Sequence, residues 1–352
     1  MRLAVVSDTH FGIRGDAQVM LDYQRKFFDN IFFPELKKRG IKFILHLGDL
    51  VDRRKYISFA TARKMREMFL DRVHQEGFDM DIIAGNHDVS YKNTNELNAL
   101  RELVDGKYPH IKIYDKPTEI ASGDIVYIPW ITADNREDTF KMIKETKAQI
   151  AFGHLELQGF LNNDGVASEF GDDPKLFDKF DIVLTGHYHS RIAKENILYV
   201  GCPYQMTWAD YNNDKGFHIF DTETRKTEFI KNPFQLFTKI NYNDGIKTFD
   251  QLKKAVSAED VTDAYVKIVV EEKNDPYVFD KFLAYIEKLA PFDLKVVETK
   301  SLLLYDTDIS QAEDTLTILK KSIPALDVTV DKNELERVVV DLFKRANQIE
   351  LQ

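Results

Sequence analysis

The chain has 352 residues but only one cysteine, Cys202, and no apolar run long enough to cross a membrane. A single cysteine excludes an internal disulfide, and its ordinary role is that of a small buried side chain. The apolar run from Leu3 to Val6 is shorter than the roughly 7–15 residues of a secretory signal core, and a membrane helix needs about 18 apolar residues or more. We therefore expect a cytoplasmic protein with no membrane contact.

An excess of positive charge is also absent, since 48 lysines and arginines face 58 aspartates and glutamates and the formal net charge is −10. A surface of this sign does not attract the phosphates of nucleic acid as a whole, so any contact with DNA must be local. The best local candidates are Arg53, Arg54, Lys55 and Lys92. Their position beside the motifs described next favours phosphate steering, and a solvated charged loop is the alternative.

The chain does contain five short segments in which a metal-type ligand stands beside glycine, aspartate or another histidine. They are Asp8-Thr9-His10, Gly48-Asp49, Gly85-Asn86-His87-Asp88, Gly153-His154 and Gly186-His187-Tyr188-His189. Most follow an aliphatic run that predicts a buried strand, and open α/β sheets gather their ligands at the carboxyl ends of strands. Oxygen and imidazole donors that meet at one place suit a hard or borderline divalent cation. The pattern predicts a two-metal site that cleaves phosphoesters.

The residue types in these segments suit such a site. Asp8 and His10 are two positions apart, so at a strand end both can reach one ion. Asp49 can give one carboxylate oxygen to each of two cations, and Asn86 can add a neutral amide oxygen. An isolated histidine is more often a hydrogen-bonded structural residue than a ligand. That structural role is expected for the remaining histidines, which are His46, His74, His110 and His218.

Strand-like and helix-like runs alternate along the first 235 residues. The strand-like runs are at 3–8, 43–48, 80–84, 111–114, 124–129, 149–152, 181–185, 197–200, 216–221 and 226–230. Amphipathic stretches at 19–38, 57–74 and 135–147 predict helices between them. This alternation predicts an α/β fold in which two stacked β-sheets are flanked by helices.

The character of the chain changes after Asn232-Pro233, because the metal-type residues stop. Residues 240–300 have the pattern helix, strand, helix, strand, with boundaries at 249–256, 265–270, 277–289 and 294–297, which predicts a small α/β module. Apolar residues at helical spacing over 309–320 and 335–346, with Pro324 between them, predict a helix-loop-helix tail. The expected domains are therefore 1–235, 240–300 and 301–352.

In their order and composition the motifs resemble those of the calcineurin-like metallophosphoesterase superfamily. The resemblance implies that Asp8, His10, Asp49 and His189 hold one ion, and that Asp49, Asn86, His154 and His187 hold the other. His87 would stay unligated beside the phosphate, where it stabilises charge or protonates the leaving oxygen. The implied reaction is in-line attack on phosphorus by a hydroxide that the metals activate. Manganese is the favoured ion, and magnesium is the alternative.

Within the superfamily the chain is most similar to the DNA-repair nucleases called Mre-eleven in eukaryotes and SbcD in bacteria, in particular to their shorter phage form. The similarity rests on Tyr91-Lys92-Asn93 after the Gly85 motif, Tyr108-Pro109 to Pro117, Ile128-Pro129-Trp130, and Gly201 with Lys215-Gly216-Phe217. It implies 3′-to-5′ exonuclease and single-strand or hairpin endonuclease activity in double-strand-break repair and recombination. It also implies a capping module that binds DNA and an ABC-type ATPase partner, like SbcC or Rad-fifty, on the C-terminal helices. For a phage protein the compartment would be the host cytoplasm.

A homodimer is expected from the same resemblance and from an apolar stripe. The stripe contains Met65, Met68 and Phe69, with Leu97 and Leu100 on the next predicted helix. Core packing is the alternative role for these side chains.

Two other functions stay open at this level. Asp52 stands where several cellular members have histidine, and Gly48 to Arg53 echoes the Gly-Asp-x-Val-Asp-Arg motif of protein serine/threonine phosphatases. A protein phosphatase or a small phosphodiesterase is therefore the enzymatic alternative, and the role of Asp52 is open. A catalytically silent scaffold for the ATPase is the third hypothesis, and the complete set of ligand-type residues argues against it.

Overall fold

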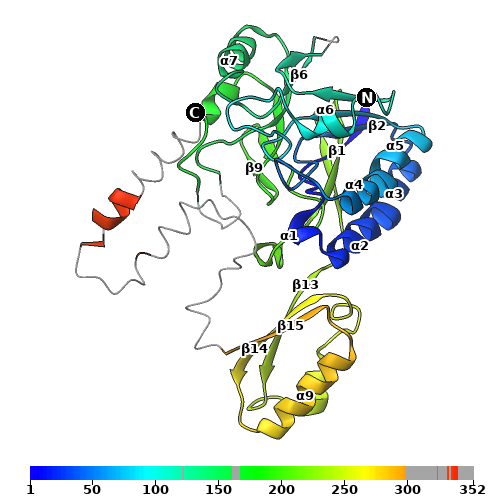
Figure 1. Cartoon of the computed structure of the whole chain (residues 1–352), viewed down its shortest axis with the longest axis vertical. Coiled ribbons are helices and arrows are strands. Elements are labelled where there is room, and N and C mark those ends of the chain that lie inside the picture. Colours follow the sequence, from blue (N-terminus) through cyan, green and yellow to red (C-terminus); the bar gives the residue numbers. More distant parts are fainter. Residues whose placement is uncertain (121–122, 161–166, 299–322, 324–330, 333, 340–352) are drawn as a thin grey trace. The chain divides into compact units, whose positions relative to one another are not determined.

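The structure is a computed structural model in which residues 1–120, 123–160, 167–298, 323, 331–332 and 334–339 are described. The chain separates into two compact units, residues 1–301 and 302–352. Figure 1 shows the sheets and helices of the first unit. Within the described ranges, no helix has the length and apolarity needed to span a bilayer.

Two six-stranded sheets make up most of the first unit. The strands of the first sheet, in spatial order, are β12 (Thr227–Lys231), β11 (Gly216–Asp221), β1 (Arg2–Val6), β2 (Phe43–His46), β3 (Asp79–Ile83) and β4 (Ile111–Tyr114). Those of the second are β5 (Thr118–Glu119), β6 (Ile125–Ile128), β7 (Ile150–His154), β8 (Ile182–Gly186), β10 (Ile197–Tyr199) and β9 (Ile192–Lys194). In the first sheet β1 to β4 run parallel, and β11 and β12 continue the sheet beyond β1 through antiparallel pairs. In the second sheet the four central strands run parallel, and the edge strands β5 and β9 are antiparallel to their neighbours.

Alternate residues of a strand point to opposite faces of its sheet, and this period builds two separate cores. Along β1, Leu3 and Val5 belong to a core cluster that also contains Phe152 of the second sheet. Ala4 and Val6, on the other face, belong to the cluster formed with the helices. The two sheets therefore stack face to face and helices cover their outer faces, which confirms the predicted fold.

Helical segments cover the first sheet on its outer face. The helices of the first unit are α1 (Ile13–Asp16), α2 (Gln18–Phe27), η1 (Phe28–Phe32), α3 (Phe33–Arg39), α4 (Phe59–Met65), η2 (Arg66–Leu70), α5 (Asp71–Gln75), α6 (Ala99–Leu103), α7 (Arg136–Glu145), η3 (Pro174–Phe177), η4 (Trp208–Asp210), α8 (Phe249–Lys254) and α9 (Pro276–Lys288). The helices expected at 19–38 and 57–74 are confirmed as continuous segments, 18–39 and 59–75, each with a π-helical turn in its middle. The second segment begins where the Ser58 hydroxyl accepts the Thr61 N–H at 3.1 Å.

A third sheet follows the two large ones and has its own core. Its strands are β13 (Phe237–Asn243), β14 (Tyr265–Glu272) and β15 (Asp293–Glu298), which pair in parallel. Helices α8 and α9 pack on it through a separate apolar cluster that includes Tyr242, Val266 and Phe282. The four elements predicted for this region are confirmed, whereas β13 was not expected. Its side chains are mostly half-buried, so the strand lacks a clear apolar pattern.

The expected tail is described only in part. The predicted helix over 309–320 lies outside the described residues. Of the predicted helix over 335–346 only residues 335–339 are described, and they are helical.

The apolar stripe that suggested a homodimer lies in the core instead. Met65, Met68, Phe69 and Leu100 have no exposed surface, because they pack against the outer face of the first sheet. Leu97 is 41% exposed. The prediction that the stripe forms a subunit interface is therefore wrong for its four buried members. A helical apolar pattern shows that a face is buried but not which surface covers it.

Two phenylalanines of one helical segment test this assignment. Phe69 is fully buried, with its ring centroid 4.8 Å from that of Phe28, whereas Phe59 is 95% exposed. We expect Phe69→Ala to lower the free energy of unfolding by about 3–5 kcal/mol. Phe59→Ala should change it by less than about 0.5 kcal/mol. Urea denaturation measures both changes. A Phe69→Ala protein with unchanged stability but an altered oligomeric state would show that the stripe forms a subunit interface.

Candidate metal centre

The candidate centre lies where strands of both large sheets end. Strands β1, β2 and β3 of the first sheet and β7 and β8 of the second contribute residues at their carboxyl ends, because parallel strands end at the same edge of a sheet. Seven side chains predicted as ligands meet there: Asp8 and His10 after β1, Asp49 after β2, Asn86 after β3, His154 at the end of β7, and His187 and His189 after β8.

One group of these side chains surrounds His10. Its Nε2 lies 3.8 Å from Asp8 Oδ1 and 3.6 Å from Asp49 Oδ2. His189 Nε2 lies 3.2 Å from the same atom of His10. Asp8, His10 and His189 are buried and offer ligand atoms that all lie within 4.8 Å of one another.

A second group surrounds Asn86. Its Oδ1 lies 2.9 Å from His154 Nε2 and 2.9 Å from His187 Nδ1. His154 Nε2 is also 3.4 Å from Asp49 Oδ2, so the Asp49 carboxylate faces both groups. The other ring nitrogen of His154 lies 2.7 Å from the carbonyl oxygen of Leu47. Because a carbonyl only accepts, this contact keeps the proton on Nδ1 and leaves Nε2 as the ligand atom of the neutral ring.

Four of the ligand residues have strained backbone conformations. Asp8, His10, Asp49 and His187 have φ angles of 54°, 43°, 55° and 96°. Such left-handed conformations are uncommon for residues with a Cβ and cost of order 1–3 kcal/mol each. The surroundings hold them in place, for example through the His187 N–H, which lies 3.2 Å from both carboxylate oxygens of Asp8. The strain directs ligands from different strands toward one point.

Glycines in the motifs permit the close approach of these loops. A Cβ at Gly186 would lie 2.0 Å from Ser7 Oγ and 2.9 Å from Asp8 Oδ2. A Cβ at Gly85 would lie 2.3 Å from Asp49 Oδ1. Both distances are far below van der Waals contact, so any larger residue would push the carboxylates away from the site.

Asp88 holds two loops of the centre together, a role that was not predicted from the sequence. Its Oδ2 accepts the N–H groups of Asp49 and Gly85 at 2.8 and 2.9 Å, and its Oδ1 accepts those of Leu50 and Val51 at 2.9 and 3.2 Å. One buried carboxylate therefore ties the loop after β2 to the loop after β3. The Gly-Asn-His-Asp motif contained the residue, but nothing in the sequence indicates which backbone it contacts.

His87 and Asp52 lie beside the ligands. The ring centroid of His87 is 4.7 Å from that of His10, and the backbone N–H of His87 donates to Asp49 Oδ1 at 2.7 Å. His87 Nδ1 contacts the backbone carbonyl of Asp52, and the Asp52 carboxylate lies 3.4 Å from His10 Nδ1. Asp52 therefore contacts His10 through its side chain and His87 through its backbone.

The buried carboxylates of the centre require positive charge nearby, as the pKa values of the histidines indicate. Burial lowers the pKa of His187 to about 3 and that of His189 to about 4, so both rings are neutral at pH 7. Burial also acts to lower the pKa of His154, but the Asp49 carboxylate outweighs it and raises the pKa to about 9. His10 behaves in the same way, because Asp52 and Asp8 raise its pKa well above the ordinary value. Protonated histidines thus neutralise the buried carboxylates.

These residues fit a divalent cation. Carboxylate, amide and imidazole donors together form the ligand set of a hard or borderline ion. The two nitrogens of His10 and His189 face each other at 3.2 Å, an arrangement that needs a proton or a cation between their lone pairs. Metal ions can therefore replace protons at these nitrogens.

The four basic residues expected to steer phosphate differ in their exposure and in their partners. Arg53 forms an ion pair with Asp16 at 2.8 Å and donates to the carbonyl of Gly12. Arg54 is half-buried, and Lys55 and Lys92 are exposed. The first three line one hollow of about 200 Å³ together with Tyr56 and Leu97, and Lys92 does not line it.

The other histidines and the cysteine lie outside the centre. His46 Nε2 pairs with the Thr9 hydroxyl at 3.0 Å, and His110 pairs with Asp79 at 3.2 Å, so the structural role is confirmed for both. The rings of His74 and His218 instead pack against Tyr108 and Phe229. Cys202 is buried, as expected.

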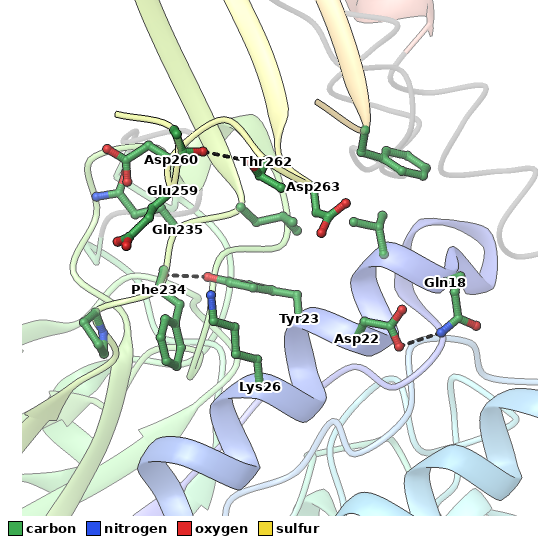
Figure 2. A pocket seen from close by; sticks show the side chains of 15 residues that line it. Gln18, Asp22, Tyr23, Lys26, Phe234, Gln235, Glu259, Asp260, Thr262 and Asp263 are labelled. Carbon is green, nitrogen blue, oxygen red and sulfur yellow. Dashed lines mark hydrogen bonds between the residues drawn. The ribbon is translucent and has the colours of Figure 1, made fainter. Parts of the chain in front are cut away.

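A larger hollow, of about 870 Å³, lies beside α2 (Figure 2). Four acidic residues, Asp22, Glu259, Asp260 and Asp263, line it together with Lys26. The Tyr23 hydroxyl donates to the carbonyl of Phe234 at 2.8 Å at its edge. The acidic lining repels phosphate, so the hollow does not extend the candidate centre as a substrate site.

The sequence model of calcineurin-like phosphoesterases matches residues 1–191 of the chain, a range that contains all seven converging side chains. The chain is a calcineurin-like phosphoesterase. Exonuclease subunit 1 of Enterobacteria phage T4 is 31% identical to this phosphoesterase over 99% of the chain and 100% of that relative. The SbcD component of the nuclease SbcCD from Staphylococcus saprophyticus is 24% identical over 70% of this chain and 74% of its own. An archaeal phosphodiesterase of known structure aligns with 66% of this chain and 100% of its own, at 16% identity and a TM-score of 0.32.

The charge balance of this phosphoesterase predicts that metal binding releases protons. At pH 7.5 a raised pKa keeps His10 and His154 protonated while the site holds no metal, and a cation must displace those protons to reach their nitrogens. We expect the release of about two protons on saturation with manganese. Calorimetry in buffers of different ionisation enthalpy measures the number. Binding without proton release would mean that neither histidine is a ligand.

Proposed function

We propose that this phosphoesterase is a metal-dependent DNA nuclease, with 3′-to-5′ exonuclease and single-strand or hairpin endonuclease activity. The convergence of seven ligand-type side chains on one buried centre carries the proposal, because it suits cleavage of a phosphodiester. The direction toward DNA is supported by two relatives that are named as an exonuclease subunit and a nuclease. The first of them corresponds to this chain over 99% of its length, so the similarity also includes the third sheet.

The proposed ion sites follow the two groups of side chains. One ion would be held by Asp8, His10, Asp49 and His189, and the other by Asp49, Asn86, His154 and His187. When bound, two such ions activate water for attack on phosphorus and offset the charge of the phosphoryl oxygens. Manganese suits the mixed nitrogen and oxygen donors, and magnesium is the alternative.

His87 is proposed as the catalytic residue that acts on the substrate directly. Its Nδ1 contacts a backbone carbonyl, which only accepts, so Nδ1 carries a proton. Nε2 is then the nitrogen that can meet the substrate. As an imidazolium, His87 donates from Nε2 to a phosphoryl oxygen or passes that proton to the leaving oxygen. Asp52 positions the rings of both His87 and His10.

Local positive charge would guide DNA to the centre. Lys55 and Lys92 are exposed and Arg54 is half-buried, so these side chains are proposed to steer phosphates. Arg53 is held by Asp16 and is better suited to fix the loop after β2. Residues 1–235 are proposed as the nuclease domain. The module of β13–β15 with α8 and α9, which follows them, is proposed as a capping domain that binds DNA.

A protein phosphatase or a small phosphodiesterase is the alternative. The sequence Gly48 to Arg53 favours it, since it matches the phosphatase motif. The correspondence of the whole chain with an exonuclease subunit favours the nuclease.

The function can be tested with two histidine variants. Purified protein with manganese should degrade labelled DNA, and His87→Ser should keep both ions but lose at least about 100-fold in turnover, the usual effect of removing a general acid. His187→Ala should lose ion binding as well as turnover, because an imidazole ligand disappears. Cleavage assays and metal calorimetry give the two readouts.

Three outcomes would contradict these assignments. Turnover of a small phosphodiester without DNA cleavage, even with an ATPase partner added, would favour the alternative function. Loss of metal from the His87→Ser protein would make His87 a ligand. Two undiminished ion sites in the His187→Ala protein would remove His187 from the ligand set.

The proposed partners are DNA, a second copy of the chain and an ABC-type ATPase of the SbcC or Rad-fifty kind. The proposed role is in repair and recombination in the cytoplasm. If a phage encodes the protein, this is the cytoplasm of the host. The relative that belongs to the nuclease SbcCD supports the ATPase. For the homodimer, exposed apolar side chains offer a better surface than the buried stripe. Tyr56, Phe59 and Leu97 are 66%, 95% and 41% exposed.

Deletion of residues 301–352 tests the ATPase contact. Residues 302–352 of the deleted segment form a compact unit of their own, separate from the unit that contains the centre. We expect the shortened protein to bind manganese and cleave DNA at the basal rate, while it no longer co-purifies with the ATPase and loses ATP-stimulated processing of duplex ends. If the shortened protein unfolds or loses basal cleavage, the tail belongs to the catalytic unit and not to a partner interface.

A further inference from the structure

A small cavity of about 230 Å³ opens next to the metal centre on the side of His154. Its lining includes Trp130, Ile131, Arg136, His154, Glu156 and Asp172. It is smaller than the roughly 300–1,000 Å³ of pockets for drug-sized ligands, so it suits a single flat ring system. His154 lines this cavity and also belongs to the candidate centre, so the cavity and the centre are adjacent.

Trp130 forms an aromatic wall of the cavity and packs against two ligand residues. Its ring centroid lies 5.2 Å from that of His187 at an interplanar angle of 36°, and 6.1 Å from that of His154. Two hydrogen bonds hold the backbone of Trp130 in place. Its carbonyl accepts from the side-chain amides of Asn95 at 2.9 Å and Asn135 at 3.0 Å. The position of the wall is therefore set by the same scaffold that positions the ligands.

The cavity also has a polar, preformed rim. Arg136 pairs with Asp172 and lies over the ring of Phe140, with 4.5 Å between the guanidinium carbon and the ring centroid. Asp172 donates its N–H to the carbonyl of Glu156 at 2.9 Å, which joins the two segments of the rim. Gly171 allows this approach, since a Cβ there would lie 2.3 Å from the same carbonyl oxygen.

We propose that this cavity receives the nucleobase of the nucleotide whose phosphate is cleaved. The base would lie with its face on Trp130 and Ile131 and its polar edge toward Arg136 and Asp172. An apolar wall with a polar rim matches a base, whose faces are apolar and whose edges carry donors and acceptors. A second phosphate fits less well, because Glu156 and Asp172 add two carboxylates to one guanidinium. The inference rests on the proposed nuclease function and names a recognition site within it.

The test compares two oligonucleotides that differ only in the nucleotide to be removed, one natural and one abasic, with the full-length protein and manganese. Stacking of a base on an aromatic side chain contributes about 1–3 kcal/mol, which corresponds to a preference for the natural substrate of about 5- to 150-fold in kcat/KM. Trp130→Leu should abolish this preference, and Trp130→Phe, which retains an aromatic face, should keep most of it.

The outcomes separate the cavity from the nuclease function. If the wild-type protein cleaves neither oligonucleotide, the nuclease proposal fails and the inference fails with it. If the wild type cleaves both equally, or Trp130→Leu keeps the preference, the cavity holds no base while the nuclease stands.

A second variant covers the case in which Trp130→Leu loses its ions, since Trp130 touches His187. Arg136→Met removes a rim contact instead and should lower the preference at least about threefold. Calorimetry checks that both ions still bind to each variant. A full preference in the Arg136→Met protein, together with lost ions in the Trp130→Leu protein, would overturn the inference.

Discussion

Two buried carboxylates, Asp8 and Asp49, are the constraint on which the rest of the centre depends. Both are almost fully removed from solvent. A buried charge is costly unless opposite charge or hydrogen bonds compensate for it. Imidazoles surround these carboxylates. The Asp49 carboxylate raises the pKa of His154, and Asp52 together with Asp8 raises the pKa of His10. A site that holds protons in place of cations is prepared to exchange them for metal ions.

The fold meets this constraint with contacts behind the ligands as well as with the ligands themselves. Asp88 accepts four backbone N–H groups and so joins the loops after β2 and β3. The carbonyl of Leu47 orients His154, which belongs to the other large sheet. Asp52 holds His10 and His87. Partners of this kind tune and orient a metal site, and strained ligand conformations persist only where such partners over-determine them.

Substrate recognition needs features that the net charge does not provide. The chain carries a net charge of −10, and the large hollow beside α2 is acidic, so general attraction of DNA is weak. Recognition must then depend on short-range contacts near the ions. The exposed Lys55 and Lys92, which we propose steer phosphate, and the cavity lined by Trp130, which we propose receives a base, would offer two such contacts of different chemistry.

The ligand-type residues and the two-sheet fold could be predicted from the sequence, because strand periodicity and residue chemistry are local properties of the chain. The surfaces that those residues face depend on tertiary packing. The stripe with Phe69 was recognisable as buried, but whether the core or a second subunit covers it depends on distant residues. The same holds for Asp88, whose partner Asp49 lies 39 positions away, and for Trp130, which becomes a cavity wall only where loops from several strands meet. Local patterns predict what a residue can do, whereas its partners follow from packing among segments that are far apart in the chain.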